Sequence, residues 1–487
     1  MVELENKATS LWRNFFNVRM VQIRTFHMTW FAFFSCFFAW FGIAPLMIIV
    51  REEMGFTKSQ VGWTIIASVA VTILARFFIG WLCDRIGPRL SYTYLLMLGA
   101  FPVALIGLSD SFTTFLIFRL MIGVIGASFV ITQYHTSVMF APNVVGTANA
   151  TSAGWGNLGG GVTQFVMPLI FSALVILFAS VSGVEVTDID SAPAEFKALA
   201  WRMSMVIVGV VIFLTGIAYY FLTQDAPEGN YKDLRARGKM PPKKNVTGTY
   251  FNAMRDYRVW ILFLIYGACF GIELTVNNVA ALYFYDYFDG ITLVTAGLIA
   301  ASFGLMNIFA RTLGGIFGDN FASLWGLKGR SFWLFIVLLG EGLALMLFSQ
   351  MNVLFLAIPA LIVFSLFTQM SEGATYSVVP FINKRALGAV AGVVGAGGNA
   401  GAVAAGFLFK GALAWDQVFL IIGMVVTCAS FLAFFIRFTP ENEEEEKAAF
   451  EAANLEALQM RANRANEALQ QSITVVEEYN RKQQSKS

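Results

Sequence analysis

Twelve apolar runs, each about 20 residues long and so long enough to cross a roughly 30 Å hydrocarbon core as an α-helix, recur along the 487-residue chain. They begin near positions 26, 60, 90, 113, 145, 202, 259, 291, 331, 353, 388 and 417. Only 13% of the residues are charged, against roughly 25% in an ordinary soluble domain. The sequence therefore predicts an all-α membrane protein with twelve transmembrane helices.

A polar connector divides the runs into two sets of six. We expect an N-terminal segment at 1–25, a first six-helix half at 26–223, a linker at 224–258, a second half at 259–438 and a charged helical tail at 439–487. The linker contains eight Lys or Arg residues, and loops rich in these residues face the cytoplasm. The linker, the tail and both chain termini are therefore predicted to be cytoplasmic.

The shorter loops and the tail agree with this orientation. Basic pairs recur on the side of the linker, at Arg85 and Arg89, Lys328 and Arg330, and Lys384 and Arg385. In the tail, apolar residues recur at steps of three and four, which is typical of an amphipathic helix. Two interpretations stay open for the tail, a solvated segment or a helix that docks onto a cytosolic partner.

Several classes of function are excluded by what the chain lacks. It has two histidines and four cysteines, and the cysteines lie inside apolar runs, so no disulfide framework or metal-ligand cluster is predicted. No P-loop or nucleophile-elbow motif occurs, and the excess of positive charge belongs to loops rather than to a nucleic-acid surface. We expect a protein of the lipid bilayer that is not an enzyme, binds no nucleic acid and needs no cofactor.

The two halves share an internal repeat. Residues 75–84 align with 310–319, with matching Ala-Arg, Gly and Asp positions, and residues 154–159 align with 396–401 around Asn157 and Asn399. Repeated halves with a site at their interface are characteristic of secondary transporters.

The repeat places one arginine at the same depth in each half. Arg76 and Arg311 each precede a loop aspartate by eight residues, which puts them about 12 Å inside the membrane at 1.5 Å per residue. A charge there costs at least about 2.5 kcal/mol, so two of them favour an anion between the halves. Pairing with a buried carboxylate (Glu273, Glu341 or Glu372) and snorkelling to the surface are the open alternatives.

Further polar and aromatic groups lie on the same helices. Tyr266, Phe270, Glu273 and Asn277 follow steps of four, three and four, so they share one helix face. The amides of Asn157 and Asn399 could donate to an anion, and the surrounding glycines permit close helix approach. Ordinary packing is the alternative for the glycines and for Phe270.

Two sets of motifs resemble known families. The run from Gly80 to Arg89, its partial copy from Gly315, and Arg119-x-x-x-Gly123 resemble signatures of the major facilitator superfamily, in which loop charges at Asp84, Arg85 and Asp319 would form gating ion pairs. The runs 153–161 and 304–315 are similar to those of the nitrate/nitrite porters, and the first is closest in wording to their high-affinity nitrate-uptake branch.

That resemblance implies roles for particular residues. Arg76 and Arg311 would clamp nitrate, and the pocket would be lined by Asn157, Tyr266, Phe270 and Phe129, to which the repeat adds Asn399. The glycines of the two matching helices would move during alternating access, among them Gly154, Gly156, Gly159, Gly397 and Gly398.

The predicted function is nitrate import across the plasma membrane by alternating access, driven by protons. A monovalent anion entering a negative interior is opposed by about 2.3 kcal/mol per 100 mV, so more than one proton must accompany it. Glu273 and Glu372 are the first candidates to carry them, before Glu341, His27 and His135. The alternatives are a nitrate/nitrite antiporter, a nitrate sensor that signals through the tail, and a carrier of another anion.

Overall fold

The computed structural model describes residues 11–140, 145–185, 191–239, 254–382 and 387–441, with single positions at 8, 189, 443, 444, 447, 466, 469, 470 and 473. The first half contains α1 (Val21–Trp40), α2 (Met47–Met54), α3 (Lys58–Ile86), α4 (Pro88–Leu105), α5 (Phe112–Gly123), α6 (Ser128–Met139), α7 (Val145–Val181) and α8 (Ala194–Leu222). The second half contains α11 (Tyr257–Tyr287), α12 (Leu293–Leu305), α13 (Ala310–Ser349), α14 (Leu354–Val378), α15 (Leu387–Lys410) and α16 (Trp415–Ser430). Within the described residues the fold is all-α, as predicted.

Eleven segments of the described chain are long and apolar enough to cross a membrane, one fewer than the sequence predicts. The difference is α1, whose first turns contain Arg24 and His27 and are therefore more polar than those of the other spans. The rest of α1 is deeply buried, including Phe33 and Phe37, and it contacts α7 and α8. With α1, the bundle therefore has the twelve long helical segments that the sequence predicts.

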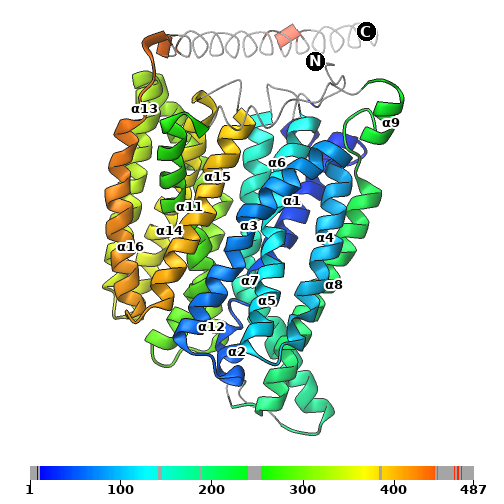
Figure 1. Cartoon of the computed structure of the whole chain (residues 1–487), viewed down its shortest axis with the longest axis vertical. Helices are drawn as coiled ribbons and strands as arrows, with labels where there is room; N and C mark the ends of the chain where they lie inside the picture. The colour runs from blue at the N-terminus through cyan, green and yellow to red at the C-terminus, as the bar shows by residue number, and fades with distance from the viewer. Residues whose placement is uncertain are drawn as a thin grey trace, which may run out of the picture.

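The two sets of helices stand side by side, with α1 to α8 in one group and α11 to α16 in the other (Figure 1). The short helix α9 (Tyr231–Ala236) lies at one end of the bundle, which we call the connector face, and α2 lies at the opposite end, the α2 face. α3 runs from the α2 face to the connector face, so its final residues approach the connector.

Short breaks interrupt one span in each half. A 3-10 turn at Val124–Ala127 separates α5 from α6, and another at Met306–Ile308 separates α12 from α13. Phe129 and Arg311 are each the second residue of the helix that follows a break. α13 itself comprises two helices joined across Trp325 and Gly326, where the φ of Gly326 is 63°, a value that glycine adopts at little steric cost.

The halves touch along α3 with α15 and α7 with α12. At the second crossing, a Cβ atom on Gly161 would lie 2.6 Å from the carbonyl carbon of Gly304, closer than real side chains approach. Only glycine therefore allows this backbone contact, and small residues at helix crossings are what close packing in a membrane requires.

The loop between α3 and α4 is tied to the end of α8. Gly87 has a φ of 93°. Pro88 is the first residue of α4, a position where a backbone N–H would have no hydrogen-bond partner within the helix. The carboxylate of Asp225 accepts hydrogen bonds from the backbone N–H groups of Arg89 and Tyr231, both at 2.9 Å. Burial raises the pKa of Asp225, and these two hydrogen bonds oppose the rise.

Candidate anion site between the two halves

Arg76 projects from α3 toward the second half and is 8% exposed. Its Nη1 donates to the carbonyl oxygen of Gly395 on α15 at 2.8 Å. Its Cζ lies 5.7 Å from the ring centroid of Phe129 and 5.9 Å from that of Phe270. Nε and Nη2 are buried and have no hydrogen-bond partner among the described residues, so two donors of a charged group are available to a ligand.

Arg311 approaches the same ring from the second half. Its Nη1 lies 2.7 Å from Oε2 of Glu372, its Nη2 donates to the hydroxyl of Tyr266 at 3.0 Å, and its Cζ lies 5.9 Å from the centroid of Phe270. One guanidinium from each half therefore lies 5.9 Å from the ring centroid of Phe270. In this conformation Arg311 therefore pairs with a buried carboxylate, which is one of the alternatives to an anion clamp. Arg76 forms no such pair within the described residues.

Aromatic rings fix the geometry around the arginines. Tyr266 and Phe270 are stacked with centroids 5.1 Å apart and planes 13° apart, and the ring of Tyr376 meets Tyr266 edge-on at 5.1 Å. A Cβ atom on Gly395 would lie 3.3 Å from the hydroxyl of Tyr376 and 3.5 Å from Nη1 of Arg76. The aromatic rings and the hydroxyl of Tyr376 therefore lie close to the guanidinium of Arg76.

Tyr376 and Gly395 were not identified as site residues from the sequence. A signal for Tyr376 exists, because it follows Glu372 by four residues and so shares its helix face. Gly395 contributes a backbone carbonyl, which carries no signature in the sequence.

Three carboxyl groups lie behind Arg311, and all are fully buried. Oε1 of Glu273 accepts a hydrogen bond from Nδ2 of Asn307 at 2.7 Å. Glu273 and Glu341 both lie close enough to Glu372 to interact with it electrostatically. Arg311 is paired with Glu372, and ionised side chains at Glu273 and Glu341 would add like charges at a depth where each charge is costly.

The two predicted amides lie on helix faces that adjoin the site. Asn157 stands between Gly154, which approaches the carbonyl oxygen of Asn307, and Gly161, which meets Gly304. Asn399 follows Gly395 by one turn of α15. Both side chains are buried, and neither amide oxygen accepts a hydrogen bond from another described residue. Within the described residues no hydrogen bond joins either amide to a guanidinium, so their contact with a bound anion stays a prediction.

The predicted mobile glycines mark close helix contacts. Added Cβ atoms would overlap Phe33 at Gly156, the carbonyl of Phe34 at Gly159, the carbonyl of Phe263 at Gly397 and the ring of Phe270 at Gly398. At Gly154 the approach to Asn307 is looser, at 3.4 Å.

Other predicted residues are placed elsewhere. Arg85 is exposed near the end of α3, whereas the side chains of Asp84 and Asp319 lie outside the described residues, as do Lys384, Arg385 and most of the tail. His135 bonds the hydroxyl of Tyr219 at 2.6 Å and the carbonyl of Gln224 at 2.8 Å, and His27 bonds the carbonyl of Phe15 at 2.7 Å. Both histidines therefore bond groups of the first half or of the segments that flank it. In the described part of the chain, no group of three metal-ligating side chains occurs.

Comparisons with known proteins agree with this architecture. The model of the Major Facilitator Superfamily matches residues 29–377 and, in a second match, 274–476. A bacterial homologue of the human lysosomal transporter Spinster, in an inward-facing and unoccupied conformation, superposes with a TM-score of 0.63 at 16% identity, covering 86% of this chain and 99% of that chain. That likeness concerns the fold alone.

Sequence relatives are more specific. High affinity nitrate transporter 2.5 of Arabidopsis thaliana is 40% identical over 84% of this chain and 77% of its own length. Nitrate transporter 2.1 of Chlamydomonas reinhardtii is 37% identical over 85% and 74%. Nitrate/nitrite transporter NrtP of Picosynechococcus is 30% identical over 78% and 83%.

The two-half bundle and the family match define a multi-pass membrane transporter rather than an enzyme, as the sequence predicted. The chain belongs to the nitrate/nitrite porter family of the major facilitator superfamily. The family resemblance of its motifs is thereby confirmed.

Proposed function

We propose that this protein imports nitrate by alternating access and couples the import to protons. The observation that carries the proposal is the pair of guanidiniums from opposite halves, Arg76 and Arg311, whose Cζ atoms each lie 5.9 Å from the ring centroid of Phe270. Since Arg76 keeps two buried donors that have no partner in the described part of the chain, an anion between the halves would satisfy them.

Nitrate suits this arrangement better than a bulky anion. It is planar and monovalent, and a guanidinium presents parallel N–H donors that bind a flat oxyanion in bidentate fashion. The stacked rings of Tyr266 and Phe270 offer a flat surface of matching shape. The relatives named as nitrate transporters support the same choice of substrate.

Coupling to protons would operate through the pair of Arg311 and Glu372. While Glu372 is ionised, it occupies Nη1 of Arg311. A proton on Glu372 would weaken that bond and release the guanidinium for nitrate, so proton binding and anion binding would favour each other. After the anion leaves, the ion pair would form again as the proton departs.

A second carboxyl would supply the second proton. One proton with one nitrate carries no net charge, so the membrane potential helps only when at least two protons enter with each anion. Glu273 adjoins Glu372 and is held by Asn307, which makes it our candidate for the second proton.

The orientation follows from the basic connector. We propose that the connector face is cytoplasmic, that both termini lie on that side, and that the protein resides in the plasma membrane. Cytosolic contacts of the tail belong to the same proposal.

The decisive experiment is nitrate uptake into proteoliposomes under an inward proton gradient, with the lumen either empty or loaded with nitrite. We expect uptake into empty vesicles that a protonophore abolishes. Uptake that needs internal nitrite and ignores the protonophore would establish an antiporter instead. Binding of nitrate without uptake in either case would indicate a sensor.

Glu273→Gln tests the second proton separately. We expect it to flatten the dependence of uptake on pH while nitrate binding persists. A variant with an unchanged pH profile would leave Glu273 as a structural residue, and Glu52→Gln, at an exposed position of α2, is the matched control.

A further inference from the structure

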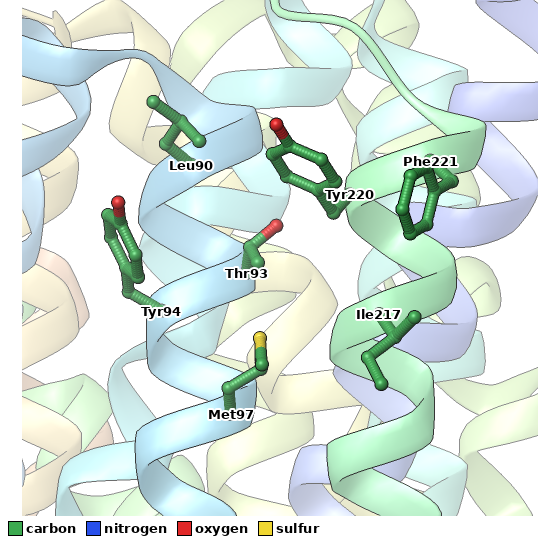
Figure 2. Close-up of a pocket in the computed structure, with 7 residues that line it drawn as sticks. All are labelled: Leu90, Thr93, Tyr94, Met97, Ile217, Tyr220 and Phe221. Carbon is green, nitrogen blue, oxygen red and sulfur yellow. The ribbon is translucent and has the colours of Figure 1, made fainter.

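An apolar groove lies on the outside of the first half, between α4 and α8 near the connector face. Its volume is about 270 Å³, and its lining consists of Leu90, Thr93, Tyr94, Met97, Ile217, Tyr220 and Phe221. Figure 2 shows the residues of α4 facing those of α8 across this groove. Phe221 is 75% exposed and Tyr94 is 49% exposed, so in a bilayer the groove opens toward lipid.

The mouth of the groove at the connector face carries a fixed cation. The guanidinium carbon of Arg89 lies 4.1 Å from the ring centroid of Tyr220, and its Nε donates to the carbonyl oxygen of Tyr220 at 2.8 Å. Arg24, on α1, donates from Nε to the carbonyl oxygen of Leu222 at 2.7 Å. Two guanidiniums are thus anchored to the same end of α8.

The charge of Arg89 has no side-chain salt bridge within the described residues. The charge of Asp225 interacts with that of Arg89, but its carboxylate oxygens accept hydrogen bonds from the backbone N–H groups of Arg89 and Tyr231 rather than from the guanidinium. Toward the opposite end of α8, an arginine that stacks on an aromatic ring does form a salt bridge. There Arg202 stacks over Trp201 at 4.6 Å but is neutralised by Glu53 at 2.7 Å.

We propose that the groove between α4 and α8 binds an anionic phospholipid, with one acyl chain along the apolar lining and the phosphate at Arg89 and Arg24. Basic residues at the end of a groove between transmembrane helices are suited to acidic lipid headgroups. The hydroxyls of Tyr94 and Tyr220 point toward the same end of the groove as Leu90 (Figure 2), and tyrosines with this orientation are typical of the bilayer interface. This site is separate from the anion site, so its test does not depend on the proposed transport.

The test is lipid retention by the purified full-length chain, measured by native mass spectrometry after titration with dioleoyl phosphatidylglycerol or dioleoyl phosphatidylcholine. We expect preferential retention of phosphatidylglycerol. Arg89→Gln should weaken that retention about five-fold, since one basic side chain near an anionic lipid contributes about that factor. Arg237→Gln, at an exposed position just after α9, should leave it unchanged.

Two further measurements keep the proposal falsifiable. Ile217→Trp should fill the groove and lower the retention of phosphatidylglycerol without changing any charge, and size-exclusion chromatography verifies that each variant is folded. Equal retention of both lipids by the unmodified protein, or equal retention of phosphatidylglycerol by Arg89→Gln and Arg237→Gln, would overturn the proposal. So would displacement of the lipid by inorganic phosphate, because the headgroup alone would then account for binding.

Discussion

Nη1 of Arg311 lies 2.7 Å from Oε2 of Glu372, whereas Arg76, the equivalent arginine of the first half, bonds the carbonyl oxygen of Gly395 at 2.8 Å. The internal repeat thus places two arginines alike and gives them unlike partners. A buried ion pair that loses one partner is strongly destabilised, so whatever engages Arg311 must act together with a change at Glu372. Arg76 has no such restriction and can receive an anion first.

Glu372→Gln removes the ionisable partner of Arg311. In the unmodified protein, nitrate affinity should rise by up to about ten-fold for each unit that the pH falls, because protonation of Glu372 accompanies the binding of each anion, whereas the second proton, on Glu273, is needed for uptake and not for binding. In the variant, Arg311 faces a neutral amide at every pH, so affinity should be high and independent of pH, while proton-driven accumulation is lost. Isothermal titration with nitrate at acidic and neutral pH measures the first effect, and proteoliposome uptake measures the second. A pH dependence equal to that of Glu52→Gln would contradict the mechanism.

Arg311→Lys keeps the positive charge and removes the flat pair of donors. An ammonium cannot bond Glu372, Tyr266 and an anion in the geometry that the guanidinium provides. We expect nitrate affinity to fall by about 10- to 100-fold, since a hydrogen bond to a charged group contributes roughly 1.5–3 kcal/mol. Nitrate titration of the purified variant checks this, and affinity near that of the unmodified protein would refute the bidentate argument.

The sequence predicted the helices, because they follow from run length, and the repeat predicted equivalent positions for Arg76 and Arg311, whose Cζ atoms both lie 5.9 Å from the ring centroid of Phe270. Which acid pairs with Arg311 could not be predicted, since Glu273, Glu341 and Glu372 stand on three different helices and helix packing decides among them. The hydrogen bond from Arg76 to the carbonyl oxygen of Gly395 could not be predicted from the sequence, because any residue supplies a backbone carbonyl. α1 was counted correctly as a helix of the bundle, although Arg24 and His27 make it more polar than the other spans.

Gly395→Ala tests the close contact beside Arg76. Its methyl group would lie 3.3 Å from the hydroxyl of Tyr376, which must move by a few tenths of an ångström, and in ordinary contact, 3.5 Å, with Nη1 of Arg76; overpacking costs about 1–3 kcal/mol. We expect nitrate affinity to fall by about ten-fold, the change that corresponds to roughly 1.4 kcal/mol.

Gly315→Ala is the matched control, because no atom lies within 4 Å of its added Cβ. In this open helical position alanine should be neutral or stabilising by up to about 1 kcal/mol. Nitrate titration and thermal unfolding of both variants separate a local effect at the site from a general effect of alanine in a helix. Equal affinities would show that Gly395 is not needed for the geometry of Arg76.

The last prediction concerns the α2 face, where an ion pair joins the halves. Arg51 on α2 bonds Asp286 on α11 through both of its terminal nitrogens, with Nη2 at 2.8 Å from Oδ1, and this bond raises the pKa of Arg51. On the same face Nζ of Lys410 lies 4.0 Å from the ring centroid of Trp63. Because these contacts link α2 with α11 and α15 with α3, opening of this face must break them.

Arg51→Gln should therefore raise the population of molecules open at the α2 face by about two- to five-fold, the range expected for a partly exposed ion pair worth roughly 0.5–1 kcal/mol. Spin labels on Glu52→Cys and Asp289→Cys, two exposed positions on either side of the pair, would report longer distances in this variant. The exchanged pair, Arg51→Asp with Asp286→Arg, should restore the original distance distribution because it restores opposite charges across the same gap. If Arg51→Gln and the exchanged pair both give the distribution of the unmodified protein, the ion pair does not hold the α2 face closed, and the contact of Lys410 with Trp63 becomes the next candidate.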